Sequence, residues 1–385
     1  MNETIPKGRT GRGAPWGLIG MIGLVVLAEA SVARRGLDLL DMDDWAYRKN
    51  VRLAARGAGR YDVLCFGDSL IKLGVVPRAV EERSGLRVCN LAVSGSQAPA
   101  SYVMLRRVLD SGAKPSAVVV DFQPPLLRLG PRHNLTRWAN IMTPFEAAEL
   151  ARWARDPDLF ATVALGRLLP SYHRRTGVRA NVMGALSGAG DPRRFQNFLA
   201  FRNWSRNGGA QLMLPSPAMK TMTEKEALEI RRAFYPAWEC HPANVAGLER
   251  FLALAAEHDV PVYWVLPPLL PALQTQLARS GIDARHEAFI RSWQDRYPNL
   301  VVIDGRNKVS DPDAFFDANH LSGGGAYAFS LALGDALRQA RRGDRGVPAN
   351  RWVALPEFRV GPIPKGFEDI NQSQVALEAM GKATR

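Results

Sequence analysis

Three residues, far apart in the chain, have the types and spacing of a nucleophilic catalyst. Ser69 lies just beyond the apolar stretch Asp62–Phe66 and before a helix-length segment. At the end of a parallel strand such a hydroxyl stands at the edge of the sheet, where a helix N-terminus favours developing negative charge. Asp317 and His320 are three residues apart, so one loop can present an imidazole together with the carboxylate that orients it. These residues are the candidate nucleophile, general base and orienting acid.

Polar residues also follow the neighbouring strands. Gly95 comes after the second apolar stretch, and a glycine there lets the backbone approach a substrate and offer an N–H to an oxyanion. Asp121 and Gln123 follow the third stretch, at the carboxyl edge where α/β proteins bind ligands. We expect both, together with Asp68 next to the serine, to line the site, although capping of a helix or turn is the alternative.

Each residue of the presumed catalytic set has an ordinary structural interpretation too. Ser69 could cap the helix that follows its strand, where serine and aspartate are common. His320 could be a surface histidine, and Asp317 a turn residue. Their joint presence, just before the glycines at 323–325, favours catalysis. A metal site built on Asp317, Asn319 and His320 lacks companion ligands, so we expect no metal.

The elements that must position these residues follow an alternating pattern. Short apolar or β-branched stretches alternate with helix-length segments in which apolar residues recur at spacings of three and four. This pattern predicts an α/β fold in which a parallel sheet of about five strands is covered by helices on both faces. The predicted strands are Asp62–Phe66, Arg87–Leu91, Ala117–Phe122, Val260–Leu266 and Leu300–Asp304, and two of the predicted helices are Ala98–Leu109 and Val245–Ala256.

Residues 126–240 interrupt this rhythm, and we expect a mainly helical insertion or cap between strands three and four. The stretch 126–239 holds 17 Lys+Arg against nine Asp+Glu, which is +8 of the net charge of +13. Four of the nine tryptophans also lie there. An anionic glycan gripped by charge and stacking and an anionic membrane surface both fit, whereas dispersed charge disfavours nucleic acid. The residues for glycan contact are Arg128, Arg132, Arg137, Trp138, Arg202 and Trp204.

The N-terminal segment 1–35 has the pattern of an export signal. Lys7, Arg9 and Arg12 precede a largely apolar run that continues to Ala33. An uncleaved single-pass anchor, a signal cleaved after Ala30 and a buried core helix are the alternatives, and the basic residues that follow favour the anchor. We expect the domain at 60–340, after a connector at 36–59, to lie outside the cytoplasm. A surface tail covers 341–385.

The composition of the chain excludes several classes of protein. The chain has 385 residues, of which 46% are hydrophobic and 23% charged, and it contains a single stretch apolar enough to span a membrane. A mainly disordered chain, a collagen-like fibre and a polytopic membrane protein are therefore excluded. Cys65, Cys89 and Cys240 cannot all pair internally, and although Cys65 and Cys89 could bridge neighbouring strands, parallel strands rarely offer that geometry.

The sequence resembles the SGNH (GDSL) hydrolase superfamily, over roughly 61–123 and 260–337. The resemblance implies a flavodoxin-like sheet with Ser69 as nucleophile, His320 as general base and Asp317 as its orienter. It also implies that the backbone N–H groups of Ser69 and Gly95 form the oxyanion hole. The matching blocks are Gly67-Asp68-Ser69-Leu70, Asn90…Gly95 and Asp317…His320.

One block departs from the family pattern. The family's third block, Gly-x-Asn-Asp, supplies an asparagine amide to the oxyanion hole, whereas residues 120–125 contain none. Gln123 could donate from its amide instead, or Asn134 could fold back. Loss of one such donor typically lowers the rate about 10²–10³-fold. The site is therefore slower, specialised or inactive relative to the family pattern.

A similar departure is found in membrane-associated SGNH-like proteins of exopolysaccharide acetylation and teichoic-acid modification. The resemblance implies a membrane-tethered esterase or O-acyltransferase that acts on acyl esters of envelope carbohydrate or lipid, alongside envelope acylation partner proteins. It implies no cofactor and no nucleic acid. The alternative is a catalytically silent SGNH-like module that binds glycan or scaffolds an envelope complex.

Overall fold

A parallel sheet of six strands forms the centre of the computed structural model, which describes residues 16–34, 42–188, 192–340 and 350–383. The strand order is β2-β1-β3-β4-β5-β6, so the chain leaves β1 towards one edge and then returns to the other side of β1. The carboxyl ends of β1 and β3 therefore flank a topological switch point, where open α/β sheets bind ligands. The strands are β1 (Val63–Cys65), β2 (Val88–Asn90), β3 (Ala117–Val120), β4 (Val262–Leu266), β5 (Leu300–Asp304) and β6 (Trp352–Ala354).

Helices cover both faces of the sheet, because alternate strand residues point to opposite sides and nearly all are apolar. Leu64 and Trp264 belong to the core on one face, whereas Cys65 and Tyr263 belong to the core on the other. The first face packs against α2 (Met42–Arg56), α5 (Ala98–Asp110), α13 (Pro242–Glu257) and α15 (Ile282–Arg296), and the second against α3 (Ser69–Gly74), α4 (Pro77–Ser84), α14 (Pro271–Arg279) and α16 (Gly323–Ala340).

The expected count of five strands was wrong, because β6 adds a sixth at the edge beside β5. Its ladder includes hydrogen bonds from Val302 N to Arg351 O and from Leu355 N to Asp304 O. The strand has three residues and lies in a segment rich in charge, proline and glycine, so its pattern is too short to be recognised. Part of the expected surface tail thus belongs to the sheet.

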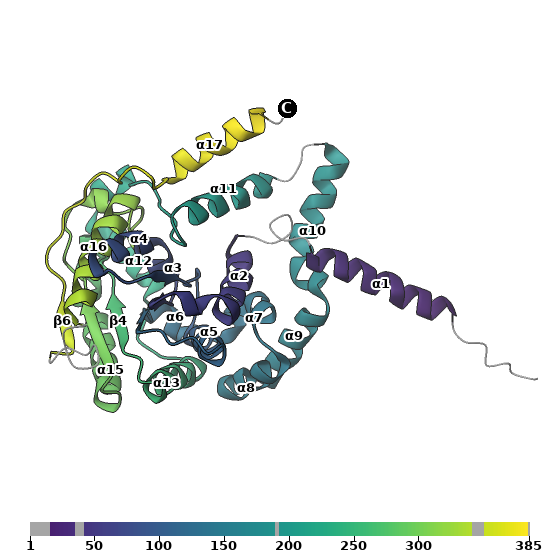
Figure 1. The fold of residues 1–385 in the computed structure, drawn as a ribbon, viewed down its shortest axis with the longest axis horizontal. Helices are drawn as coiled ribbons and strands as arrows, with labels where there is room; N and C mark the ends of the chain where they lie inside the picture. Colours follow the sequence, from purple (N-terminus) through teal and green to yellow (C-terminus); the bar gives the residue numbers. More distant parts are fainter. Residues whose placement is uncertain (1–15, 35–41, 189–191, 341–349, 384–385) are drawn as a thin grey trace, which may run out of the picture.

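Between β3 and β4 the chain is helical. Within the described residues 126–188 and 192–240 no strand occurs. Helices α8, α9 and α10 lie on the side of the molecule from which α1 (Trp16–Arg34) projects (Figure 1). The helices are α6 (Pro124–Arg128), α7 (Leu135–Ile141), α8 (Pro144–Ala154), α9 (Pro157–Leu168), α10 (Pro170–Ser187), α11 (Pro192–Arg206) and α12 (Glu224–Phe234), with short 3₁₀ turns at Pro131–Asn134 and Pro217–Lys220.

Two segments outside the predicted domain pack onto it. The expected connector contains α2, an amphipathic helix that buries Ala46, Tyr47 and Ala54 in the core. The tail contains α17 (Ile370–Ala383), which runs beside α11 (Figure 1). Arg202 of α11 pairs with Glu368 just before α17, with an Nη2–Oε1 distance of 2.8 Å. The remaining 3₁₀ turns are Ala58–Arg60 and Pro312–Ala314.

Among the described helices, α1 is the one long and apolar enough to cross a membrane, judged by length and composition. None of its residues is buried, unlike those of a core helix in a globular protein. A signal sequence has the same properties, so retention of α1 and its orientation stay predictions.

No disulfide joins the two strand cysteines. Cys89 pairs in register with Leu64, and Cys65 pairs with Asn90. Because neighbouring positions along a strand face opposite sides, the two thiols lie in the two different cores, and both are free.

Candidate active site

Ser69 is the first residue of α3, directly after the turn that leaves β1. The carboxylate of Asp68 caps this helix by accepting a hydrogen bond of 2.7 Å from Leu70 N. Gly67 makes the turn with φ +126°, and a Cβ there would lie 1.7 Å from Oδ1 of Asp121. A glycine is required for both reasons, because L-residues avoid this conformation and the space is filled. The turn therefore holds the serine at the sheet edge.

His320 and Asp317 come from the loop before α16, and they complete a hydrogen-bonded chain with Ser69. The serine Oγ lies 2.8 Å from His320 Nε2, and His320 Nδ1 lies 2.9 Å from both carboxylate oxygens of Asp317. The backbone N–H groups of Asn319 and His320 also donate to Asp317 Oδ1, at 2.8 and 2.9 Å. The structure thus brings together three residues that sequence analysis selected as a catalytic set.

Electrostatics keep Asp317 ionised. Burial opposes its ionisation, but hydrogen bonds and the nearby charge of His320 outweigh it, so the pKa of Asp317 lies below its ordinary value. An ionised carboxylate accepts the N–H of His320 Nδ1, which leaves Nε2 free to accept the proton of the Ser69 hydroxyl. This arrangement is the one required of a general base beside a serine nucleophile.

A second carboxyl pair lies beneath the serine. Asp68 and Asp121 are almost fully buried, and Asp68 N donates to Asp121 Oδ1 at 3.0 Å. Burial raises the pKa of both groups, and the neighbouring Asp68 carboxylate raises that of Asp121 further. Asp121, whose pKa is raised the more, is therefore the first of the two to take up a proton as the pH falls. Asp68 lines the pocket over Ser69, whereas Asp121 supports the turn under it.

A pocket of about 390 Å³ opens over Ser69. Polar residues already described and apolar side chains line it together. Several of the apolar lining residues come from the insertion, which sequence analysis did not place at the site. Ile230 and Phe234 lie four residues apart on α12, a helical spacing that could have indicated a shared face. The additional lining residues are Pro125, Leu126, Ile230, Phe234, Tyr235 and Asn319.

The candidate oxyanion donors belong to residues that line the same pocket. Ser69 is at the first position of α3, so its N–H has no acceptor within the helix. Gly95 lines the same pocket with φ +68°, in a turn where Ser96 N donates to Val93 O. Gln123 lines it as well, and its side-chain amide forms no hydrogen bond with the described residues. Three residues with a candidate N–H donor thus line one pocket.

Asn134 does not line the pocket, contrary to expectation. Its amide nitrogen donates to Gly95 O at 2.9 Å and to Gln97 Oε1 at 2.8 Å, so both hydrogens are used. Its oxygen accepts from Arg137 at 2.9 Å. The residue is on the short 3₁₀ turn before α7 and holds the Gly95 turn from behind. Its role is to position that turn.

A buried ion pair ties α3 to α2 behind the site. Lys72, one turn after the serine, is almost fully buried, and its Nζ lies 2.6 Å from Asp43 Oδ1 and 3.2 Å from Ser94 Oγ. Burial opposes ionisation of Asp43, but Lys72 and Arg137 lower its pKa below the ordinary value. The pair links the nucleophile helix to the Ser94–Gly95 turn, so both sides of the oxyanion site depend on α2.

His286 supports the turn after β3. Its Nε2 lies 3.0 Å from Phe122 O, next to Gln123, and its ring packs between Trp238 and Trp264. Burial lowers the pKa of His286 to about 3. The imidazole is therefore neutral at physiological pH and donates its Nε2 hydrogen to the carbonyl.

No protein-family model matches the chain, and no curated protein sequence matches it either. Within the described residues, no group of three or more His, Cys, Asp or Glu is arranged to hold a metal ion.

Proposed function

We propose that the protein is a membrane-anchored SGNH-type serine esterase or O-acyltransferase. Its substrates would be acyl esters, acetyl esters foremost, of envelope carbohydrate or lipid. The observation that carries the proposal is the hydrogen-bonded chain from Ser69 Oγ through His320 to Asp317. Chance placement of these groups is a poor explanation, because 251 residues separate the serine from the histidine.

The reaction would proceed through an acyl-enzyme. Ser69 Oγ attacks the ester carbonyl carbon while His320 Nε2 takes the hydroxyl proton, and Asp317 stabilises the imidazolium. The negative oxygen is stabilised by the N–H groups of Ser69 and Gly95 and by the amide of Gln123. Collapse breaks the ester bond, and His320 returns the proton to the departing alcohol. Water or a sugar hydroxyl then attacks the acyl-enzyme, again deprotonated by His320, and Ser69 is regenerated.

The strand order supports the proposed SGNH-type fold. The first five strands follow the order 2-1-3-4-5, which is that of flavodoxin-like sheets, and Ser69 lies at the switch point of this order. The sixth strand extends the same sheet. A flavodoxin-like sheet is the fold that the SGNH resemblance implies.

The pocket supports a small acyl group. Its volume of about 390 Å³ lies at the lower end of the range for small-molecule sites. Pro125, Leu126 and Ile230 line it together with Ser69, so an acyl chain bound there would contact apolar side chains. A helix such as α1 would hold this pocket at the membrane surface, with the domain outside the cytoplasm.

The test compares the intact protein with Ser69→Ala. We expect a fluorophosphonate probe to label the native protein and acetyl-ester hydrolysis or acetyl transfer to accompany it, with both lost in the variant. Ser111→Ala, which changes an exposed serine at the end of α5, is the matched control and should retain both activities. Full activity in Ser69→Ala would refute the assignment.

A second candidate function is a catalytically silent glycan-binding or scaffolding module. It is favoured by one observation, the absence of an asparagine donor, since Asn134 is fully engaged elsewhere. Incubation with acetylated and unacetylated glycans plus an acetyl donor separates the candidates. Loss of acetate indicates a hydrolase, gain indicates a transferase, and glycan binding without either, together with no labelling of Ser69, indicates the silent module.

A further inference from the structure

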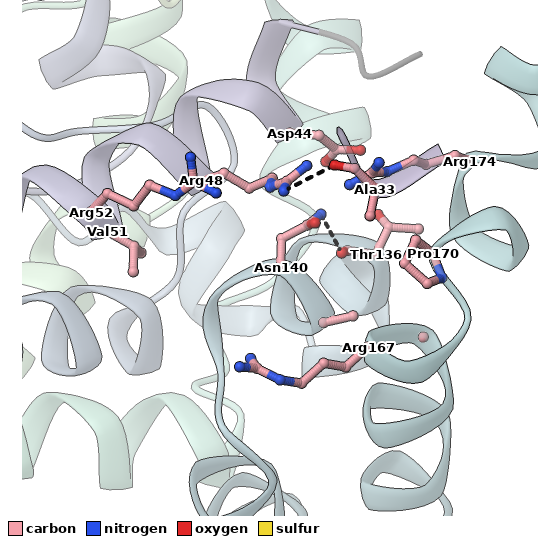
Figure 2. A pocket seen from close by; sticks show the side chains of 12 residues that line it. Ala33, Asp44, Arg48, Val51, Arg52, Thr136, Asn140, Arg167, Pro170 and Arg174 are labelled. Carbon is pink, nitrogen blue, oxygen red and sulfur yellow. Dashed lines mark hydrogen bonds between the residues drawn. The ribbon is translucent and has the colours of Figure 1, made fainter. Parts of the chain in front are cut away.

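A second pocket, of about 400 Å³, lies where the C-terminal end of α1 meets the domain. Four arginines from three helices line it, as Figure 2 shows: Arg48 and Arg52 from α2, Arg167 from α9 and Arg174 from α10. Among the described lining residues Asp44 is the one acid, so the lining carries a formal charge of +3. Asp44 is itself shared with Arg137, at an Oδ1–Nε distance of 3.6 Å.

Backbone carbonyls orient three of the four guanidinium groups. Arg48 Nη2 donates to Ala33 O at 3.5 Å, Arg167 Nη1 donates to Met142 O at 2.6 Å, and Arg174 Nη1 donates to Val32 O. A guanidinium has five N–H donors, so each keeps several donors beyond the one used. The described residues include no carboxylate that forms an ion pair with any of the four arginines. The groups are held in place and carry unused donors.

The positive charges of these arginines repel one another, so the folded protein is less stable when no anion lies between them. Burial, and after it the charge of Arg48, lowers the pKa of Arg174 to about 10. The pKa of Arg48 is lowered in the same way, by burial and then by Arg52. Asp44 opposes both effects, and Glu29 opposes that on Arg174, without cancelling them. A bound anion would relieve the repulsion and accept the free N–H donors.

The position of the pocket indicates where such an anion would come from. Helix α1 has 19 residues, and at about 1.5 Å per residue its length approaches the ~30 Å hydrocarbon thickness of a bilayer. Its last residues would therefore lie at the level of the lipid headgroups. Ser171, at the start of α10, fixes this end by donating its N–H to Glu29 at 2.8 Å.

The neighbouring surface is apolar and exposed, as expected of a face that meets a membrane. Leu168 and Leu169, directly after the pocket residue Arg167, are 73% and 40% exposed. Tyr172 on α10 is 52% exposed, and Leu186 at the far end of the same helix is 78% exposed. Apolar side chains beside arginines are typical of segments that lie in the interface of an anionic membrane.

We propose that this pocket binds the phosphate group of an anionic membrane lipid through Arg48, Arg52, Arg167 and Arg174. Guanidinium groups match phosphate oxygens in bidentate geometry, and four of them, from three helices, line this one pocket. A lipid is favoured over free phosphate by the exposed apolar surface beside the pocket and by its place at the end of α1. The inference rests on α1 as the retained anchor of the proposed function and is independent of the chemistry at Ser69.

The experiment uses the full chain in a non-ionic detergent and measures lipid binding by native mass spectrometry. The probes are phosphatidylglycerol, phosphatidylcholine and diacylglycerol, with inorganic phosphate as a soluble competitor. Arg52→Gln is the principal variant, because Arg52 is exposed and forms no hydrogen bond with the described residues, so its replacement spares the fold. Arg56→Gln, one turn further along α2, is exposed but does not line the pocket and serves as its matched control.

A double variant tests the arginines that contact α1. Arg48→Gln with Arg174→Gln removes two charges from the pocket, whereas Arg175→Gln with Arg179→Gln removes two exposed charges from α10 outside it. Any loss from general surface attraction would be equal in the two doubles. Labelling of Ser69 by a fluorophosphonate in each variant reports separately on the proposed function.

The expected result is that the native chain and both controls bind phosphatidylglycerol at least about tenfold more tightly than phosphatidylcholine or diacylglycerol. Arg52→Gln should lose about tenfold in that affinity, the effect of one charge-assisted hydrogen bond, and the pocket double, which removes two arginines, should lose more than that. Equal affinity for all three lipids, or equal loss in control and pocket variants, would overturn the proposal. Displacement of the lipid by an equal concentration of phosphate would overturn the lipid assignment.

Discussion

The hydroxyl of Tyr235 donates a hydrogen bond of 2.8 Å to Oδ1 of Asn319, one of the two residues between Asp317 and His320. Tyr235 follows α12, so a helix of the insertion is joined directly to the loop that carries the general base. The tyrosine is buried, and burial raises its pKa, so the hydroxyl remains a donor. The insertion therefore completes the site instead of only covering it.

Removal of this contact should loosen the loop. In Tyr235→Phe the ring packing is kept and one buried hydrogen bond is lost, which costs about 1 kcal/mol of unfolding free energy. Because His320 is then less well held, we expect kcat/KM for an acetyl ester and the rate of fluorophosphonate labelling to fall about tenfold. Tyr297→Phe removes a hydroxyl whose partner is Glu249 O, remote from the site, and should leave both rates unchanged.

Gln123 should act as the third oxyanion donor. Gln123→Glu keeps the shape of the side chain but replaces the amide donor by a carboxylate, so kcat should fall by about 10²-fold or more with a smaller change in KM. Gln123→Asn keeps the amide donor on a shorter side chain, so it tests whether the length of the side chain is needed for the amide to contact the oxyanion. Steady-state kinetics on one acetyl ester measure all three proteins, and unchanged kcat in Gln123→Glu would show that the two backbone donors suffice.

The raised pKa of Asp121 makes the free energy of unfolding depend on pH. Its pKa is raised in the folded protein, so the folded state binds more protons than the unfolded state above the ordinary value of 3.8. The free energy of unfolding therefore decreases as the pH rises from 3.8 towards the raised pKa of the folded protein. Asp121→Asn imitates the protonated group and keeps the acceptor for Asp68 N, so it should be more stable than the native protein near neutral pH.

That advantage should shrink as the pH is lowered towards 3.8. Urea unfolding at several pH values measures it. Asp121→Ala, which leaves Asp68 N without its acceptor, should instead lose about 1–3 kcal/mol at every pH. A constant difference between native protein and Asp121→Asn across the pH range would contradict the assignment of the proton.

His286 should account for part of the loss of unfolding free energy that occurs as the pH is lowered. Its pKa falls from 6.5 to about 3 on folding, so the unfolded state binds more protons between these values. Its contribution is fully present above the upper value and is lost, by at most about 1.4 kcal/mol per pH unit, as the pH falls towards the lower one. His286→Gln keeps a donor for Phe122 O without titrating in this range.

Urea unfolding near pH 7 and near pH 5 tests this prediction. His286→Gln should lose less stability between the two conditions than the native protein does. His258→Gln changes an exposed histidine at the end of α13 and should follow the native protein. If His286→Gln and the native protein lost equal amounts, the neutral buried imidazole would be disproved.

The local parts of the site were predictable because short-range chain geometry produces them. A glycine turn after a buried strand places Ser69 at the sheet edge, and a three-residue spacing allows Asp317 to reach His320 within one loop. Periodicity also located the five longer apolar stretches, and β5 has the predicted bounds, because a buried strand requires continuous apolar residues.

Contacts between segments that are distant in the sequence could not be predicted from local patterns. Asn134 was expected at the substrate and instead holds Gly95, because an amide takes whichever partners the folded chain brings within reach. Tyr235 was missed, because neither its helix nor its spacing indicates that Asn319 would lie beside it. The same holds for β6, whose three residues pair only because β5 offers an open edge.

The residues alone indicated a candidate catalytic set, an α/β arrangement of the elements and an apolar N-terminal helix, because composition, spacing and periodicity depend on neighbours along the chain. Tertiary structure decided that Ser69 and His320, 251 residues apart, meet at 2.8 Å, and that α12 closes their pocket. It also gathered four arginines at the end of α1. Such convergence arises from packing across the fold, which no local pattern encodes.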